Sequence, residues 1–190
     1  MSADATDEAL MLAFQAGDAR AFEQLYARYR GTLYRFLVRQ CGNAADGEEL
    51  YQDVWLTLAR QRARWEPRAT LKTFLYRIAH SRLLDHYRRH RRHGRHGGFL
   101  DLADVDESVL EDSCPAVRAE AAWEQAALQA AWRHCLDALP PPQREAFLLR
   151  EEGGLELAQL AEVAGIAIEA AKSRLRYAVN RLRQCLGARA

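Results

Sequence analysis

Apolar residues recur at intervals of three and four along almost the whole chain, and no stretch alternates long enough to make a strand. This spacing places the apolar side chains on one face of a helix. The 190 residues are enough for one ordinary domain or two small ones, and a hydrophobic share of 49% is enough for buried cores. The sequence therefore predicts an all-α protein.

Three helices are predicted in the first half of the chain. The first has its apolar stripe within residues 22–37, the second within 50–58, and the third runs from about residue 71 to 87. The segment CGNAADG separates the first two helices, and WEPRAT separates the second from the third. Together these helices predict an N-terminal domain of residues 1–93.

After Arg92 the helical pattern stops and glycines, acids and Pro115 take its place. Between Asp101 and Asp112 there are six acids and no base. We therefore expect a flexible acidic linker over residues 94–116, long enough to suggest a function. The helical pattern resumes at about residue 117 and opens a second domain, residues 117–190.

The second domain carries the pattern of a helix-turn-helix in LELAQLAEVAGIAIEAAKSRL. A helix before it ends at LPPP, and Pro141 or Pro142 should lie in the first turn of the next helix. Ala161 is small enough for two helices to touch. Gly165 follows where the chain needs a tight or left-handed turn, and Ile168 is expected to seat the second helix.

The last helix divides into an apolar face and a basic face. The inner face is predicted to hold Ile168, Ala171, Leu175, Ala178, Leu182 and Leu186. The outward stripe is Glu169, Lys172, Ser173, Arg176, Asn180 and Arg183, with Tyr177 beside it. A narrow basic helix after a turn fits the major groove of duplex DNA. The alternative is an arginine-rich, solvated helix of a small bundle.

The segment LKTFLYRIAHSRLLDHYRRHRR mixes aromatic and basic residues. Seven arginines lie between Arg77 and Arg95 against one acid, Asp85. Phosphates attract arginine, and unpaired bases stack on flat side chains, so the mixture suits a strand that is being opened. We expect Phe74 to lie mostly in the core and the arginines from Arg88 to Arg92 to contact nucleic acid. The alternative is a solvated basic tail.

Metal, redox and catalytic sites are not predicted. His86 and His90 lie one helical turn apart, with His93 and His96 beyond, yet no carboxylate or thiol visibly converges on them. The four cysteines form no CxxC pair, so Cys41, Cys114, Cys135 and Cys185 are expected to be ordinary thiols. No triad, phosphate loop or carboxylate pair indicates an enzyme, and no cofactor is expected.

No apolar run approaches the roughly 20 residues that span a bilayer, and the N-terminus is acidic where a signal peptide would be basic. A cytoplasmic protein is therefore expected.

Over nearly its full length the chain resembles the extracytoplasmic-function (ECF) sigma factors, the small two-domain class of bacterial RNA polymerase sigma subunits. GEELYQDVWLTL resembles the region that docks on the clamp coiled coil of the largest polymerase subunit. LKTFLYRIAHSRLLDHYRRHRR is similar to the region that melts and recognises the minus-ten element. The stretch from LPPPQREAF to KSRLRYA resembles the minus-thirty-five domain.

The resemblance implies three sets of site residues. Polymerase docking is assigned to Asp46, Glu48, Glu49, Gln52 and Asp53. Contact with the minus-ten element is assigned to Phe74, Tyr76, Arg77, His80, Arg88 and Arg89. Contact with the minus-thirty-five element is assigned to Lys172, Ser173, Arg174, Arg176, Tyr177 and Asn180.

The sequence departs from the family pattern at several positions. His80 stands where an Asn usually captures a flipped base, and Glu156 replaces the usual Ser or Thr cap of the first helix in the helix-turn-helix. Tyr177 stands where Arg is common, and the usual Thr-Val before Lys-Ser-Arg is missing. Base preference and phosphate contacts are expected to differ accordingly.

The resemblance also implies the partners: core RNA polymerase, through the clamp coiled coil and the flap, promoter DNA, and an anti-sigma factor. The resemblance further implies that the acidic linker passes through the RNA channel of the polymerase. The alternative is that the linker is only a soluble acidic spacer. Two other functions stay open from the residues alone. One is a helix-turn-helix regulator that acts without polymerase, and the other is a regulatory interaction protein without promoter activity.

Overall fold

The computed structural model describes the backbone of residues 5–92 and 115–188 and the side chains of residues 5–90 and 125–188. Within these ranges every regular element is helical, which confirms the all-α prediction. The elements are α1 (Asp7–Gln15), α2 (Ala19–Cys41), α3 (Ala44–Gln61), the 3-10 helix η1 (Arg62–Arg64), α4 (Leu71–Arg92), α5 (Pro115–Asp137), α6 (Pro141–Glu151), α7 (Leu157–Ala164) and α8 (Ile168–Gly187). None of them is long and apolar enough to cross a bilayer.

Local caps set the helix ends in the first domain. The Asp18 carboxylate accepts the N–H of Arg20 at 2.9 Å at the start of α2, and α2 ends at Gly42, whose φ is 77°. Asn43 then caps α3 at once, so the break between these helices is only two residues and shorter than the CGNAADG segment suggested. Helix α1, which Thr6 caps, was not predicted.

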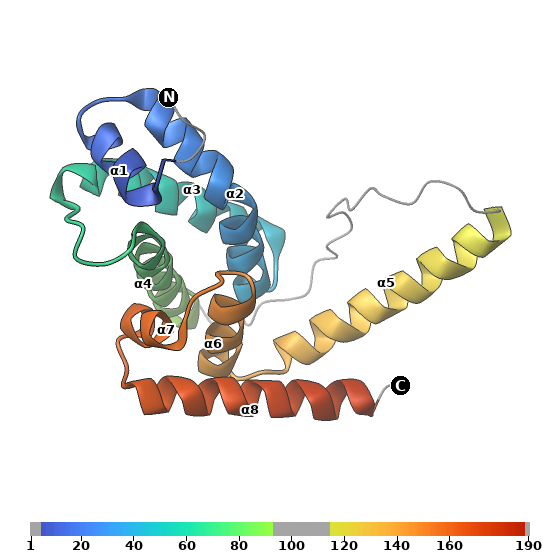
Figure 1. The fold of residues 1–190 in the computed structure, drawn as a ribbon. Coiled ribbons are helices and arrows are strands. Elements are labelled where there is room, and N and C mark those ends of the chain that lie inside the picture. The colour runs from blue at the N-terminus through green and yellow to red at the C-terminus, as the bar shows by residue number, and fades with distance from the viewer. Residues whose placement is uncertain (1–4, 93–114, 189–190) are drawn as a thin grey trace.

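The first domain packs α1, α3 and α4 around the long helix α2 (Figure 1). Its core consists of apolar side chains at the predicted helical spacing, among them Leu25, Leu33, Leu37, Leu50, Val54, Leu58, Leu71, Leu75 and Leu83. Burial of such side chains contributes about 1.5–3 kcal/mol each, so packing rather than helix propensity holds the four helices together.

The second domain consists of α5 to α8, and α6 begins at Pro141 as predicted. Helix α5 projects away from the rest of the domain (Figure 1), and Leu128 on it is 67% exposed. Among the α5 side chains that the structure describes, residues 125–130 are exposed, and near the end of the helix Cys135 forms a disulfide with Cys185 of α8. The expectation of ordinary thiols was therefore wrong for this pair, because α5 and α8 bring together two cysteines that lie 50 residues apart in sequence. Cys41 is a free thiol, and Cys114 lies outside the described residues.

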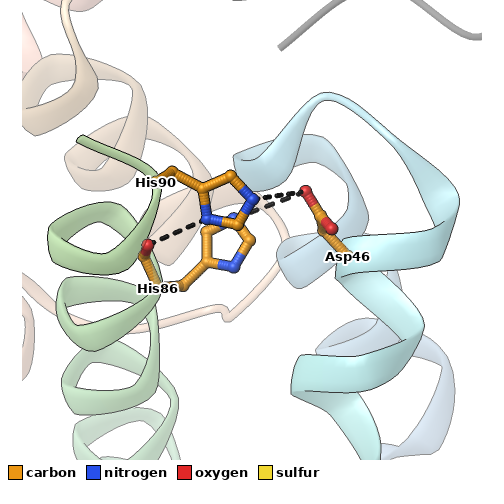
Figure 2. Close-up of side chains that lie close together, drawn as sticks. All are labelled: Asp46, His86 and His90. Atoms are coloured by element: carbon orange, nitrogen blue, oxygen red, sulfur yellow. Dashed lines mark hydrogen bonds and ion pairs between the residues drawn. The ribbon is translucent and has the colours of Figure 1, made fainter. Parts of the chain in front are cut away.

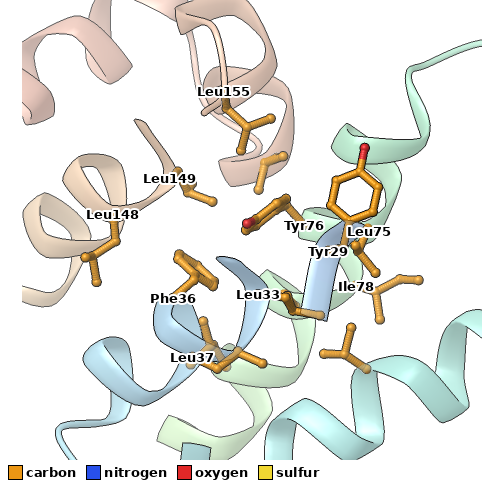
Figure 3. Close-up of a cluster of buried hydrophobic side chains, with 14 of the residues drawn as sticks. Tyr29, Leu33, Phe36, Leu37, Leu75, Tyr76, Ile78, Leu148, Leu149 and Leu155 are labelled. Atoms are coloured by element: carbon orange, nitrogen blue, oxygen red, sulfur yellow. The ribbon is translucent and has the colours of Figure 1, made fainter. Parts of the chain in front are cut away.

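The two domains share one continuous core. Helix α4 lies against α7, and α2 lies against α6 (Figure 1). Tyr76 of α4 is fully buried where they meet, between Phe36 of the first domain and Leu149 and Leu155 of the second (Figure 3). Gly153 leaves the space for this ring, since a Cβ atom there would lie 3.2 Å from Tyr76 Cζ.

Candidate nucleic-acid and docking interfaces

The residues assigned to polymerase docking lie along one side of α3. Glu48, Glu49 and Gln52 are exposed, while Asp46 and Asp53 are half-buried. Gln52 Nε2 donates to Glu48 Oε1 at 3.0 Å, one helical turn away. The result is a polar ridge that a partner can reach from solvent.

Two acids of this ridge face basic residues of α4. Arg82 Nε lies 3.1 Å from Asp53 Oδ2, and Arg89 Nη1 lies 3.8 Å from Glu49 Oε1. The ridge is therefore partly neutralised from within the domain, which leaves Glu48 and Gln52 as its most open members.

An exposed leucine continues the ridge. Leu56 lies one turn beyond Gln52 on α3 and is 53% exposed, although its neighbours Val54, Trp55 and Leu58 are buried. Leu56 was not among the residues predicted for docking. Its position four residues after Gln52, on the same helix face, was the available signal.

Three arginines of α4 are exposed to solvent, whereas its aromatic residues are buried or half-buried. Arg77, Arg88 and Arg89 are exposed, and Arg88 Nη1 lies 3.0 Å from Asp85 Oδ1. Phe74 is partly buried and packs against the core, as expected. The arginines are thus placed to reach phosphates, but Phe74 offers a base little surface.

Tyr76 and His80 lie at the boundary with the second domain. Burial raises the pKa of Tyr76 to about 12. His80 Nδ1 is hydrogen-bonded to Glu145 Oε1 of α6, and Arg77 Nη1 lies 3.8 Å from Glu162 Oε1 of α7. In this arrangement Tyr76 has no face open to a base, and His80 is held by the other domain.

The histidine pair of α4 has an acidic neighbour that the sequence did not reveal. Asp46 of α3 faces both His86 and His90 from one side (Figure 2), although no carboxylate was expected to converge on them. The sequence does not reveal this approach, because residues 46 and 86 come together only through the packing of α3 beside α4. Burial lowers the pKa of His86, which favours its neutral form.

The helix-turn-helix forms as predicted. Gly165 ends α7 with a φ of 63°, and the buried Ala161 allows α7 to approach α8. At the start of α7, Gln159 Oε1 accepts the N–H of Glu156 at 2.9 Å, and Arg150 Nη1 donates to the Glu156 carboxylate at 3.0 Å. These contacts compensate for the missing Ser or Thr cap.

The outer stripe of α8 is open to solvent. The exposed residues are Glu169, Lys172, Arg176, Tyr177, Asn180, Arg181 and Arg183, with Ser173 and Arg174 half-buried. Ala171, Ala178 and Leu182 are buried on the inner face as predicted. Ile168, in the first turn of α8, is 50% exposed, so its predicted place on that face was wrong. Arg176 lies over the Tyr177 ring, 5.2 Å from its centroid.

Comparison with known proteins agrees with this arrangement. Residues 25–93 match the family model of sigma-70 region 2, and residues 129–182 match that of sigma-70, region 4. The sigma factor CarQ of Myxococcus xanthus is 31% identical over 177 residues, which cover 92% of this chain and 94% of CarQ. The chain belongs to the ECF sigma factor family. This sigma factor binds core RNA polymerase and directs promoter-specific initiation of transcription.

Other members of the family are similar over most of their length. The ECF sigma factor SigK of Mycolicibacterium vanbaalenii is 29% identical over 189 residues, which cover 95% of this sigma factor and 89% of SigK. The fold matches CnrH, solved with the cytosolic domain of CnrY, with a TM-score of 0.67, 23% identity and coverage of 97% and 99% of the two chains. It also matches RpoE of Bartonella quintana, solved with the anti-sigma factor NepR, with a TM-score of 0.68, 22% identity and coverage of 89% and 98%.

Proposed function

We propose that this sigma factor works through three surfaces and catalyses no reaction itself. The α3 ridge docks on the clamp coiled coil of the largest polymerase subunit, α4 recognises and opens the minus-ten element, and α8 recognises the minus-thirty-five element. The observation that carries this assignment is the exposed basic stripe of α8 directly after the Gly165 turn, because this geometry presents a helix to the major groove. The polymerase performs the chemistry.

The contacts between the domains add a step to this function. Tyr76 and His80 are covered by α6 and the turn before α7, so the domains must separate before α4 can hold unpaired bases. Separation also breaks polar contacts between the domains. Arg35 Nε lies 2.9 Å from Glu152 Oε2, and Arg39 pairs with the same carboxylate. Since separation exposes part of the shared apolar core as well, contacts with core polymerase must compensate for both losses.

The domain limits of 1–93 and 117–190, with a linker of 94–116 between them, are part of this proposal. The end of α4 at Arg92 and the beginning of α5 at Pro115 support them. The path of the acidic linker through the RNA channel concerns residues outside the described ranges and stays a prediction.

We also propose that an anti-sigma factor binds this chain in the cytoplasm, where the polymerase works. CnrH and RpoE share the fold and were solved with CnrY and the anti-sigma factor NepR. A partner that clamps both domains would keep α4 covered.

The experiment is transcription in vitro with core polymerase, combined with energy transfer between fluorophores at Arg60 of α3 and Gln184 of α8, both exposed. We expect promoter-specific transcripts and a fall in energy transfer when core polymerase is added. Unchanged energy transfer in an active holoenzyme would refute the separation of the domains. Tight duplex binding by the free chain, without transcripts, would instead favour a regulator that acts without polymerase.

A further inference from the structure

Three potential metal ligands meet where the start of α3 lies beside the end of α4. They are the Asp46 carboxylate and the imidazoles of His86 and His90, whose ligand atoms all lie within 4.8 Å of one another (Figure 2). Asp46 Oδ2 is 3.5 Å from His86 Nε2 and 3.7 Å from His90 Nε2. Asp46 is also one of the residues assigned to docking, but docking does not account for the two histidines that face it.

These separations are too long for hydrogen bonds and close to those between ligands of one ion. Donor and acceptor atoms in N–H···O hydrogen bonds lie about 2.7–3.2 Å apart. In a tetrahedral zinc site with bonds of about 2.0–2.1 Å, neighbouring ligand atoms lie about 3.3 Å apart. A small inward movement of the three side chains would therefore bring their ligand atoms to the distances that a single zinc ion requires.

The ligands are already oriented by other groups. His90 Nδ1 lies 3.0 Å from the backbone oxygen of His86, and if it donates that bond, Nε2 of a neutral His90 carries the lone pair toward Asp46. Asn43, the cap of α3, donates its Nδ2 to Asp46 Oδ2 at 2.8 Å and accepts the N–H of Asp46 at 2.8 Å. Such supporting hydrogen bonds are typical of metal ligands.

The charges around the three residues suit a cation. The Asp46 carboxylate places one negative charge beside the buried His86 and the half-buried His90. Glu49 of α3 adds a second negative charge, which is offset in part by Arg89, whose Nη1 lies 3.8 Å from Glu49 Oε1. From the end of α2, Cys41 adds no charge, because burial raises its pKa to about 12.

We propose that Asp46, His86 and His90 bind one divalent cation of the zinc class. Imidazole nitrogens and a carboxylate are ligands that Zn²⁺ accepts, and the fourth position is open to water. The ion joins the beginning of α3, next to the docking acids Glu48 and Glu49, to the end of α4. A bound ion thereby fixes the position of the docking ridge relative to the promoter-contacting arginines. This structural role of the ion is separate from the recognition of promoters.

The test is titration of the full chain with Zn²⁺ by calorimetry after treatment with a chelator, and with Co²⁺ followed by visible absorption. We expect one ion per chain. Asp46→Asn and His90→Gln should each weaken binding at least about 10-fold, since loss of even a supporting contact costs 10–100-fold. His134→Gln, which removes an exposed histidine of α5, should bind as wild type does.

Two further measurements decide the outcome. Zn²⁺ should raise the Tm of the wild type but not that of His90→Gln, with circular dichroism showing equal helicity in both. The double variant His93→Gln and His96→Gln removes the neighbouring histidines of the sequence and should keep the binding. Loss of binding in that variant with retention in His90→Gln, or no binding by the wild type, would overturn the proposal.

Discussion

His80 of α4 is hydrogen-bonded through Nδ1 to Glu145 of α6, across the boundary between the two domains. Their side chains are 17% and 11% exposed. His80 is also the residue that stands where the family usually has an Asn for a flipped base. His80 therefore takes part in the contact between the two domains and is also predicted to act in the opening of the promoter.

The two partners of this hydrogen bond should differ in their effect on promoter opening. Replacing His80 by Ala leaves a buried carboxylate without its partner, which costs the closed arrangement about 1–3 kcal/mol. Glu145→Gln also weakens the contact but leaves His80 in place. We expect both variants to lower the energy transfer between the domains, and only His80→Ala to reduce the permanganate reactivity of unpaired thymines. Equal reactivity in the two variants would mean that His80 acts solely at the domain boundary.

The exposed arginines of α4 should act on separated strands. In a variant with His80, Arg88 and Arg89 changed to Ala, we expect normal recruitment to duplex promoter DNA and weakened formation of the open complex. A promoter with a pre-melted bubble should partly restore transcription, because its strands are already separated and the variant does not have to open them. Permanganate reactivity equal to that of the wild type would refute the assignment.

Docking should depend on the middle of the α3 ridge. Changing Gln52 and Asp53 together to Ala should abolish holoenzyme formation and leave helicity intact, since polar groups fix the register of an interface. The double change also breaks the ion pair of Asp53 with Arg82, whose atoms lie 3.1 Å apart. Arg82→Ala breaks the same pair and is the matched control, which should still co-purify with core polymerase. Co-purification of the double variant at the wild-type level would contradict the prediction.

The exposed Leu56 offers a second test of the same surface. Full burial of a leucine side chain contributes about 1.5–3 kcal/mol, so Leu56→Ala should weaken core binding several-fold. Leu12→Ala, on α1 and 48% exposed, is the control and should have no effect. Equal affinities of the two variants would place Leu56 outside the interface.

The disulfide between Cys135 and Cys185 should stabilise the second domain when it is oxidised. It joins residues that are 50 apart in sequence, and closing a loop of this size stabilises a fold by about 2–4 kcal/mol. Urea unfolding should therefore shift to lower concentration when reductant is added to the wild type, and Cys185→Ser should match the reduced protein. Cys41→Ser should keep the response to reductant. An identical unfolding midpoint with and without reductant would show that the bond contributes nothing.

The elements that the sequence predicted well are those whose signal is local. The apolar spacing located α2, α3 and α4, the proline run located the start of α6, and Gly165 located the turn before α8. Each of these rests on residues within a few positions of one another. Helix α1 was not predicted because it is short, and its apolar stripe includes only a few residues, among them Leu10 and Met11.

The features that the sequence did not predict depend on contacts between distant residues. Asp46 meets His86 only because α3 packs beside α4, and Cys135 meets Cys185 only because α5 and α8 end together. Ile168 fits an apolar stripe in sequence but is 50% exposed in the structure. The burial of Tyr76 also depends on distant residues, since the second domain supplies Leu149 and Leu155 beside it.

The last prediction concerns α8, where Arg176 and Arg181 are both exposed but face different surroundings. Arg176 lies on the outer stripe, one turn beyond Lys172, whereas Arg181 lines a hollow beside Cys135 of α5 and Leu139, which lies between α5 and α6. A bidentate base contact gives about 1–3 kcal/mol of discrimination, and loss of a phosphate contact weakens all sequences and lowers the salt slope by roughly one unit.

Arg176→Ala should therefore flatten base preference at one or two positions of the minus-thirty-five element. Arg181→Ala should keep the preference and reduce the salt dependence of binding. The measurement is binding of the holoenzyme to single-base promoter variants at several salt concentrations. If Arg176→Ala loses affinity equally for every variant, this arginine holds the DNA backbone, and the base-contacting face of α8 lies elsewhere on the helix.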